Sequence, residues 1–133
     1  MAAMVLDSWA LLAFFKGEPA AAAVETILQQ AASEKARLLL CVVNWGEIWY
    51  GMCRAGGAGV AEAAVNDLAQ LPIELVPADL AITRQAAIFK AANNISLADA
   101  YAAALAKTHQ ATLVTGDADF QALAREIEIQ WLK

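Results

Sequence analysis

Four carboxylates that are far apart in the sequence occupy positions at which a parallel α/β protein would gather them into one pocket. They are Asp7, Glu47, Asp99 and Asp117, and Asp119 follows two residues after the last of them. Each stands where an apolar run has just ended or where a predicted helix is in its first turn. Carboxylates a few ångströms apart raise one another's pKa, so such a pocket favours bound cations. Hard divalent ions prefer oxygen ligands, and the expected cofactor is therefore Mg²⁺ or Mn²⁺, as one or two ions.

An acidic pocket of this kind supports phosphodiester hydrolysis, because two divalent ions activate a water and stabilise its in-line attack. Zinc has little support, since the sequence contains no Cys/His ligand spacing. The lone His109 follows an alanine-rich helix, and we interpret it as a residue of that helix's C-terminus. Cys41 and Cys53 are interpreted as reduced, packed thiols of a cytoplasmic protein.

Helix capping is the simpler interpretation of each acid taken alone. Asn44-x-x-Glu47 and Ser96-x-x-Asp99 both resemble capping boxes, in which the third helical residue bonds back to the cap. The two acids that come after predicted strands would be N-caps instead. Two details go beyond capping. Asp99 is shorter than the usual Glu or Gln of a capping box, and Asp119 adds a second carboxylate after Asp117, more than capping requires. A non-catalytic binding module, with acids that only cap helices, stays open as an alternative.

Apolar runs and helical periodicities alternate along the whole chain. Strands are predicted at residues 4–6, 37–43, 72–76, 111–115 and 128–132. Helices are predicted at residues 8–15, 20–33, 45–54, 61–71, 79–92, 97–107 and 117–125, with a flexible joint at 55–59. This alternation predicts one domain over residues 1–133, with a three-layer α/β/α architecture around a central, mainly parallel sheet.

The predicted sheet explains why distant acids would converge. In open α/β sheets, ligands bind beyond the carboxyl ends of the strands, where the strand order reverses. Asp7 directly follows the first predicted strand, and Asp117 follows a later strand after one glycine. Glu47 and Asp99 lie in the first turns of helices that start at the same edge, where free N–H groups favour carboxylates.

Composition narrows the class of protein. The chain has 133 residues, of which 60% are hydrophobic, and its formal net charge is −5. This charge argues against a basic surface that coats nucleic acid, although it is compatible with a nucleic-acid enzyme whose acids bind cations. No uncharged apolar stretch approaches the roughly 18 residues of a membrane span.

At four places the chain resembles the PIN-domain nucleases, and more narrowly the VapC-type toxins of toxin–antitoxin pairs. The motifs, in order, are Val5-Leu-Asp7-Ser8, Asn44-Trp-Gly-Glu47, Ser96-Leu-Ala-Asp99-Ala100 and Thr115-Gly-Asp117-Ala-Asp119-Phe120. The resemblance covers nearly the whole chain. It implies a parallel sheet between helices, Mg²⁺ or Mn²⁺ dependence and endoribonuclease activity on RNA. It also implies inhibition by a cognate antitoxin protein and, commonly, a homodimer.

The resemblance also assigns roles to single residues. The metal-binding acids would be Asp7, Glu47, Asp99 and Asp117. Asp119 matches a further acid, and Ser8 and Thr115 match hydroxyls that orient the acids or a metal-bound water. Asp7 and Asp99 would be the central ligands. A PIN-domain nuclease of RNA processing that is not a toxin stays open as the nearest alternative.

Several surface residues are candidates for contacts. Arg54 is the best candidate for an RNA phosphate because it ends the predicted helix that carries Glu47, and Lys16, Arg84 and Lys90 are weaker ones. An aromatic and methionine group is expected mainly in the core, with some members lining an antitoxin groove: Trp9, Trp45, Trp49, Tyr50 and Met52. Possible dimer contacts on the helix of Asp99 are Tyr101, Ala102 and Leu105.

Two other classes that cluster acids at strand ends are disfavoured. A phosphatase of this type needs Asp-x-Asp after its first strand, but position 9 is Trp9. A receiver domain needs a lysine after a late strand, and none lies near Thr115.

Overall fold

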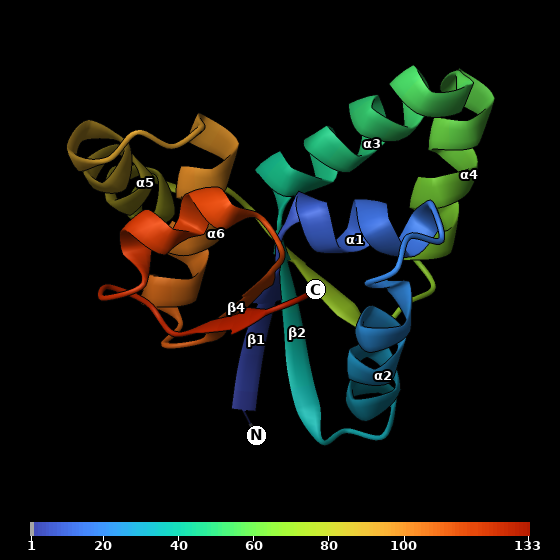
Figure 1. Cartoon of the computed structure of the whole chain (residues 1–133), viewed down its shortest axis with the longest axis horizontal. Helices are drawn as coiled ribbons and strands as arrows, with labels where there is room; N and C mark the ends of the chain where they lie inside the picture. Colours follow the sequence, from blue (N-terminus) through green and yellow to red (C-terminus); the bar gives the residue numbers. More distant parts are fainter. Residues whose placement is uncertain (1) are drawn as a thin grey trace.

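The computed structural model describes residues 2–133, and within that range strands and helices alternate (Figure 1). The strands are β1 (Ala2–Leu6), β2 (Ala36–Cys41), β3 (Ile73–Val76), β4 (Thr112–Thr115) and β5 (Ile129–Trp131). The α-helices are α1 (Ser8–Phe15), α2 (Ala21–Ala32), α3 (Val42–Gly56), α4 (Ala58–Leu68), α5 (Leu80–Ala92) and α6 (Leu97–Thr108). A 3₁₀ helix, η1 (Ala118–Leu123), follows β4.

The strands form one parallel sheet in the order β3-β2-β1-β4-β5. Strand β1 lies in the middle, where Val5 pairs with Leu39 of β2 and with Leu113 of β4. The chain builds the sheet outward from β1 to β3 and then returns to place β4 on the other side of β1. The strand order therefore reverses between β1 and β4, which is where an open α/β sheet binds its ligands.

Helices cover both faces of this sheet, α5 and α6 on one side and α1 to α4 on the other (Figure 1). Successive strand residues point to opposite faces, so each strand feeds both cores. Val5, Leu39 and Leu113 pack on the side of α5 and α6. Leu6 and Val114 pack on the side of α1 to α4. The predicted three-layer α/β/α architecture with a parallel sheet is confirmed.

Alanine brings α6 close to the sheet. Ala100 and residues 102–106 are all buried, and α6 contacts β1, β2 and β4. The predicted N-cap of α6 is confirmed, since the Ser96 hydroxyl accepts a hydrogen bond from the Asp99 backbone N–H at 3.1 Å. His109 is the C-cap of the same helix, as the sequence indicated.

The boundary between β2 and α3 differs from the prediction. The strand ends at Cys41, and Val42 and Val43 already belong to α3. Asn44 is therefore inside the helix and does not cap it; Cys41 occupies the cap position without a side-chain bond. Two β-branched residues at the end of an apolar run resemble a strand, but packing placed them in the first helical turn.

The joint between α3 and α4 is also shorter than predicted. Helix α3 continues to Gly56, and Gly57 alone separates it from α4. Its φ of 93° lies in the left-handed region that glycine adopts without strain, so one residue suffices to reverse the chain. Across the described residues, no helix combines the length and apolar character needed to cross a lipid bilayer.

Candidate metal centre

Strands β1 and β4 deliver two of the acids to the same edge of the sheet. Leu6 pairs with Val114 in the register of these strands, and Asp7 is the next residue of β1's chain. On the β4 side, Thr115 ends the strand and Asp117 follows after Gly116. Both acids therefore lie at the point where the strand order reverses.

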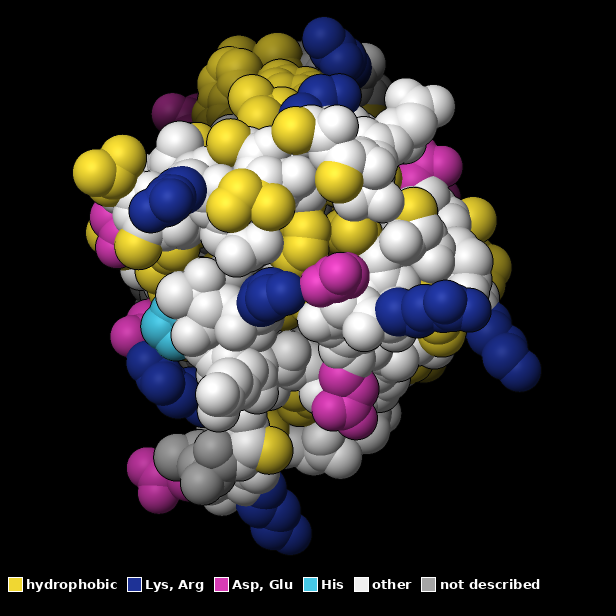
Figure 2. Space-filling view, turned by 90° about the vertical axis from the view of Figure 1, so that its left-hand side faces the viewer, with side chains coloured by type: hydrophobic (Ala, Val, Ile, Leu, Met, Phe, Trp, Pro, Cys, Tyr) yellow, Lys and Arg dark blue, Asp and Glu magenta, His cyan; other side chains and the backbone are white. Residues whose placement is uncertain are grey.

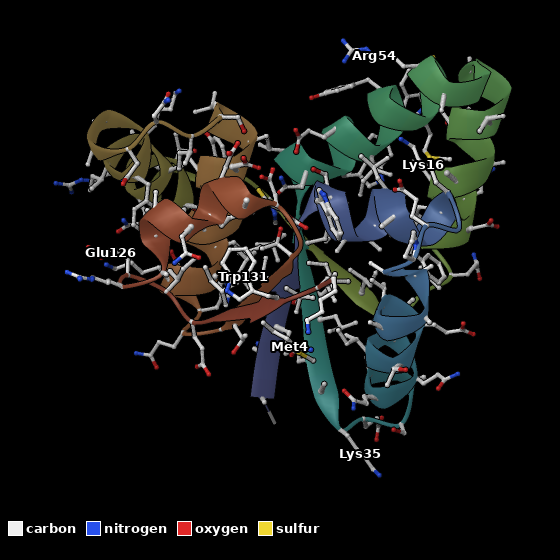
Figure 3. All side chains as sticks on the ribbon, in the orientation of Figure 1. Met4, Lys16, Lys35, Arg54, Glu126 and Trp131 are labelled. Atoms are coloured by element: carbon white, nitrogen blue, oxygen red, sulfur yellow. The ribbon has the colours of Figure 1, made fainter. Side chains whose placement is uncertain are left out.

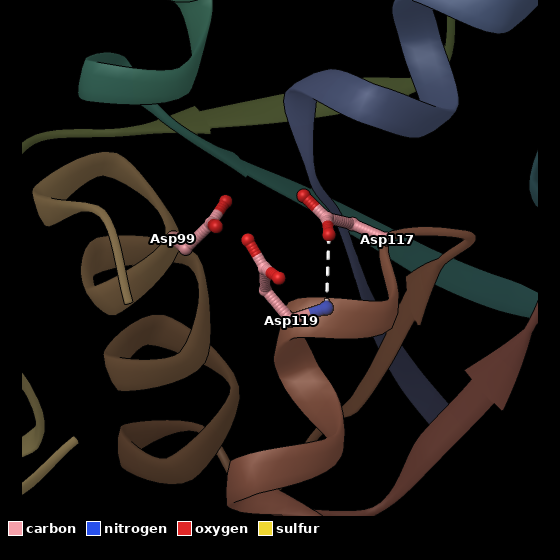
Figure 4. Close-up of side chains that lie close together, drawn as sticks. All are labelled: Asp99, Asp117 and Asp119. Atoms are coloured by element: carbon pink, nitrogen blue, oxygen red, sulfur yellow. Dashed lines mark hydrogen bonds between the residues drawn. The ribbon is translucent and has the colours of Figure 1, made fainter. Parts of the chain in front are cut away.

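Three carboxylates come closest to one another (Figure 4). One oxygen each of Asp99, Asp117 and Asp119 lie within 4.8 Å of one another. The three range from buried Asp99, through half-buried Asp117, to exposed Asp119. Asp117 accepts a hydrogen bond from the Asp119 backbone N–H at 2.9 Å, which fixes the first turn of η1 beside Asp99. This group, called the acidic triad below, has room for a cation at the solvent boundary.

Asp7 lies deeper than the acidic triad, with 1% of its surface exposed. Its Oδ1 accepts from the Ala10 backbone N–H at 2.9 Å, so Asp7 is also the N-cap of α1. Its Oδ2 accepts from the Thr115 hydroxyl at 2.5 Å. The pKa of Asp7 is raised to about 7, mainly by burial; the two hydrogen bonds oppose this increase, and the charges of Asp99 and Asp117 add to it.

The carboxyl of Asp99 is perturbed in the same direction. Burial raises its pKa to about 6, and repulsion from Asp117 is the next cause. Glu47 and Asp119 add to the increase, while a hydrogen bond from Ser96 opposes it. Two carboxyls with raised pKa values therefore sit among three further acids, an arrangement that a bound divalent cation would relieve.

Glu47 is held from three sides. Its Oε1 accepts from the Ser8 hydroxyl at 2.6 Å and from the Asn44 side-chain amide at 3.2 Å. Its Oε2 accepts from the Tyr50 hydroxyl at 3.3 Å. Ser8 belongs to α1 and the other two donors to α3, so the orientation of this carboxylate depends on how the two helices meet.

Asn44 connects the helices that carry Glu47 and Asp99. It is 0% exposed, and its amide Nδ2 also donates to the Ala98 carbonyl at the start of α6, at 3.1 Å. The expected capping box of Asn44 and Glu47 is thus replaced by a side-chain bridge between α3 and α6. The Asn44 Oδ1 has no hydrogen-bond partner. Among the described residues, it is the one buried side-chain oxygen or nitrogen that lacks such a partner.

Trp9 and Gly116 make the closest packing contact near the acids. A Cβ added to Gly116 would lie 2.6 Å from Trp9 Cζ2 and closer still to two neighbouring ring atoms. The indole therefore lies directly on the backbone that precedes Asp117. Trp9, expected in the core or an antitoxin groove, packs against the core on the side of α1 to α4 and also lies beside the site.

The four candidates for an RNA phosphate contact differ in how their side chains are held. The guanidinium carbon of Arg54 lies 4.7 Å from the centre of the Tyr50 ring, and Lys16 is the C-cap of α1 (Figure 3). Lys90, a weaker phosphate candidate, donates to the Ile95 carbonyl at 2.6 Å, so its ammonium is tied to a loop. Arg84, the other weaker phosphate candidate, is exposed on α5.

Two of the three suggested dimer contacts on α6 are not at the surface. Ala102 and Leu105 are fully buried in this chain's own core. The Tyr101 hydroxyl donates to the Thr83 hydroxyl of α5 at 2.9 Å, which ties the two helices together. The dimer prediction is therefore wrong for Ala102 and Leu105, while for the half-buried Tyr101 it stays a prediction.

Sequence reasoning underestimated one face of α3. The bridging role of Asn44 and the contact of Tyr50 with Glu47 were both missed. A signal was present, since Asn44, Glu47, Tyr50 and Arg54 follow one another at spacings of three, three and four residues. That spacing puts polar groups on one side of a helix.

The donor set fits a hard divalent ion. The acidic triad offers carboxylate oxygens alone, and Mg²⁺ and Mn²⁺ favour such ligands over nitrogen or sulfur. Cys41 is buried, and the free thiol of Cys53 does not belong to the acidic triad. His109 lies at the opposite end of α6, ten residues and about 15 Å along the helix from Asp99.

The sequence and the fold were each compared with those of known proteins. The sequence model of the PIN domain matches residues 4–126. A search of curated proteins found no match. Several solved structures match over nearly the whole chain at low sequence identity, and at such identity the match shows the fold alone.

Three of these structures illustrate the similarity. VapBC2 from Rickettsia felis, bound to a DNA fragment from its promoter, superposes with a TM-score of 0.80 at 13% identity, covering 98% of this chain and 99% of that one. VapBC-5 of Mycobacterium tuberculosis, from a toxin–antitoxin family, gives 0.66 at 21%, with 100% and 99% covered. VapC20 of the same organism, a toxin that cleaves the sarcin-ricin loop, gives 0.71 at 18%, with 90% and 93% covered.

Proposed function

The chain belongs to the PIN domain family, and from that premise we propose that it is a divalent-metal-dependent endoribonuclease, the toxin of a toxin–antitoxin pair. The observation that carries the proposal is the acidic triad at the switch point of the sheet, with Asp7 and Glu47 beside it. The cleaved bond would be an RNA phosphodiester.

The acids divide into two groups by their surroundings. Asp99, Asp117 and Asp119 would hold Mg²⁺ or Mn²⁺ through oxygens that already lie close together. Asp7 and Glu47, whose oxygens accept bonds from neighbouring hydroxyls, amides and a backbone N–H, would complete the negative field around the ion. When bound, such an ion lowers the pKa of water and stabilises charge on the phosphodiester.

The remaining polar groups would keep the acids in place. The Thr115 hydroxyl donates to Asp7 and accepts from the Asp117 backbone N–H at 3.0 Å, so it links two acids from different strands. Ser8 of α1 and Asn44 of α3 both donate to Glu47 and so hold its carboxylate in place. With the single histidine at the far end of α6, any proton taken up by the chain at this site must go to a carboxylate.

Partners follow from the family and the fold. Several structures of similar fold are VapBC complexes, which supports a cognate antitoxin as the partner that inhibits this chain.

We also propose that the chain forms a homodimer. Figure 2 looks onto the side of α5 and α6, where hydrophobic side chains gather in the upper part of the surface. Leu80, Ile88 and Leu97 of these helices are exposed and suit contact with a second copy.

Cleavage of labelled RNA with Mg²⁺ or Mn²⁺ tests the nuclease. Asp99→Asn and Asp117→Asn should each reduce the rate by about 100-fold or more, beyond the loss typical of residues outside the metal's own ligands. Asp79→Asn is the matched control, because Asp79 caps α5 through the Ile82 N–H as Asp117 caps η1 through the Asp119 N–H, but it lies outside the acidic triad. Activity that survives both a chelator and these substitutions would refute metal-dependent cleavage.

The toxin assignment has its own test. Expression of the wild-type chain should arrest growth, and co-expression of a small neighbouring protein should relieve the arrest, whereas the Asp99→Asn variant should not arrest growth. RNA cleavage without growth arrest would instead indicate a PIN nuclease of RNA processing.

One observation favours the alternative of a binding module without catalysis. Asp7 and Asp117 do accept capping bonds from Ala10 and Asp119, as the capping interpretation required. In that case the wild-type chain would not cleave RNA, and Asp99→Asn and Asp79→Asn would lower the free energy of unfolding by equally small amounts.

A further inference from the structure

One face of α3 continues outward from Glu47 through two side chains that the proposed mechanism does not use. Tyr50 and Arg54 follow Glu47 by three and seven residues, so all three lie on the same side of the helix. Tyr50 is 45% exposed, which is high for a large aromatic side chain that contacts a carboxylate of the proposed site.

Tyr50 is held at two points although it is exposed. Its hydroxyl donates to Glu47 Oε2 at 3.3 Å, and the Arg54 guanidinium lies over one face of its ring, 4.7 Å from the centre. Glu47 is itself fixed by Ser8 and Asn44, so the hydroxyl end of the ring rests on a rigid group. A solvated tyrosine on an ordinary helix surface would not have both ends defined.

Arg54 supplies a positive charge where the surrounding charge is negative. The ion pairs found among the described residues are Arg37–Glu74 and Lys107–Glu126, and Arg54 takes part in neither. It projects from the outer end of α3 (Figure 3). With a net charge of −5 and five acids at the candidate site, the chain needs such a cation to receive a polyanion next to the site.

We propose that Tyr50 and Arg54 form a contact site for single-stranded RNA, with one nucleobase stacked on the face of the half-exposed Tyr50 ring opposite Arg54 and a neighbouring phosphate bound by Arg54. The assignment of RNA as the ligand rests on the function proposed above. The strand must be single, because a base can stack on a side chain only when it is free of its own helix. Stacking accepts any base, so this site gives affinity and position without sequence preference.

Charge complementarity favours RNA over an antitoxin segment at this site. A groove for an apolar helix or strand would present aliphatic side chains, whereas here a guanidinium lies on a phenol ring one turn from a carboxylate. Arginine with an aromatic ring is the combination that single-stranded nucleic acid contacts commonly use.

Equilibrium binding of a fluorescein-labelled, mixed-sequence 12-nucleotide RNA tests the site. Ca²⁺ replaces Mg²⁺ to slow cleavage, and a gel after each titration checks that the RNA is intact. Tyr50→Ala should weaken binding about tenfold, as expected for the loss of one stacked base, while Tyr50→Phe should stay within about threefold of wild type. Arg54→Gln should reduce the slope of log K against log salt by about 0.7, the value for one phosphate of a single strand.

Matched controls separate this contact from general effects of charge and folding. Arg37→Gln removes an exposed arginine at the other end of β2, where it pairs with Glu74, and should change neither affinity nor salt slope. Thermal unfolding reports whether each variant is folded. Should Tyr50→Ala unfold, Tyr50→Leu keeps an apolar side chain without an aromatic face and carries the same prediction.

Unchanged affinity in Tyr50→Ala or Tyr50→Leu, together with an unchanged salt slope in Arg54→Gln, would overturn the RNA contact. So would variants that weaken antitoxin binding and leave RNA binding intact, since the surface would then belong to the antitoxin. The proposed function fails separately: wild-type protein that binds RNA through these residues but never cleaves it would retain the contact site and lose the nuclease.

Discussion

At the scale of single residues, hydroxyl and amide donors determine how the acids point. Thr115 joins Asp7 to the loop of Asp117, and Asn44 joins Glu47 to the carbonyl before Asp99. These donors have no charge of their own, so they order the carboxylates without cancelling the field that attracts a cation.

Asn44→Leu should separate site geometry from stability. The substitution removes the bridge to Glu47 and Ala98 but keeps a side chain with the same number and branching of heavy atoms, and it also removes the unpartnered Oδ1. We expect Mn²⁺ affinity, measured by calorimetry, to fall 10- to 100-fold, while the free energy of unfolding changes by only about 1 kcal/mol.

The exposed Asn66 of α4 provides the control, because Asn66→Leu should leave Mn²⁺ affinity unchanged. A purely structural Asn44 would give the reverse result, with a large loss of stability and normal Mn²⁺ binding.

The convergence of the five acids was predictable from the sequence, but the surroundings of each carboxylate were not. Residue type and position after strands or in first turns identified all five. Which oxygens are already occupied depends on side chains from other elements, such as Ser8 on α1 reaching Glu47 on α3. As a result Asp119, ranked last from the sequence, lies in the acidic triad, while both oxygens of Asp7 accept bonds within the protein.

At the scale of elements, the turn between β4 and η1 is the tightest part of the site. Gly116 lies under the Trp9 indole, so α1 presses on the backbone that presents Asp117. Any side chain at this position would move either the ring or the acid.

Gly116→Ala should therefore cost both stability and metal binding. Overpacking of this kind costs about 1–3 kcal/mol, measurable by urea unfolding, and Mn²⁺ affinity should fall as Asp117 moves. Adding Trp9→Ala should recover part of the Mn²⁺ affinity, a coupling that a double-mutant cycle measures.

Gly59→Ala in the first turn of α4 is the control, since a Cβ there meets nothing within 4 Å. It should be neutral or should stabilise the helix by up to about 1 kcal/mol. Equal effects of the two substitutions would contradict the role of the Trp9 contact.

Element order was largely readable from the sequence, whereas boundaries were not. Alternating apolar runs and helical periods placed all five strands and the helices between them, including the edge strand β5. The start of α3 was missed because Val42 and Val43 extend an apolar run, and periodicity alone does not show where a strand becomes a buried helix.

At the scale of the whole molecule, the clustered carboxyls link folding to pH. Asp7 and Asp99 have folded-state pKa values of about 7 and about 6, above the ordinary value of 3.8. The folded state therefore holds more protons than the unfolded state between about pH 4 and 7, and the stability that comes from those protons is lost as the pH rises through this range.

The metal-free protein should consequently be more stable at pH 5 than at pH 8. One carboxyl contributes about 1.4 kcal/mol for each pH unit over which only the folded state keeps its proton, so the decrease should amount to a few kcal/mol. Urea unfolding in chelator measures it across the pH range, and Mn²⁺ should restore more stability at pH 8 than at pH 5.

Asp7→Asn should flatten this profile, because the amide has no proton to lose in the range. An unchanged profile in that variant would show that the pH dependence arises elsewhere.

The double use of Asp7 and Asp117 as helix caps and as proposed site acids has a genetic consequence. An aspartate codon becomes an asparagine codon through one G-to-A transition, and asparagine caps helices as well as aspartate does. At Asp7 the amide oxygen could still accept from Ala10 and the amide nitrogen could donate to Thr115, whose hydroxyl has a second lone pair. A single transition at either codon should thus remove the proposed nuclease chemistry while leaving a folded protein that can still bind the proposed antitoxin.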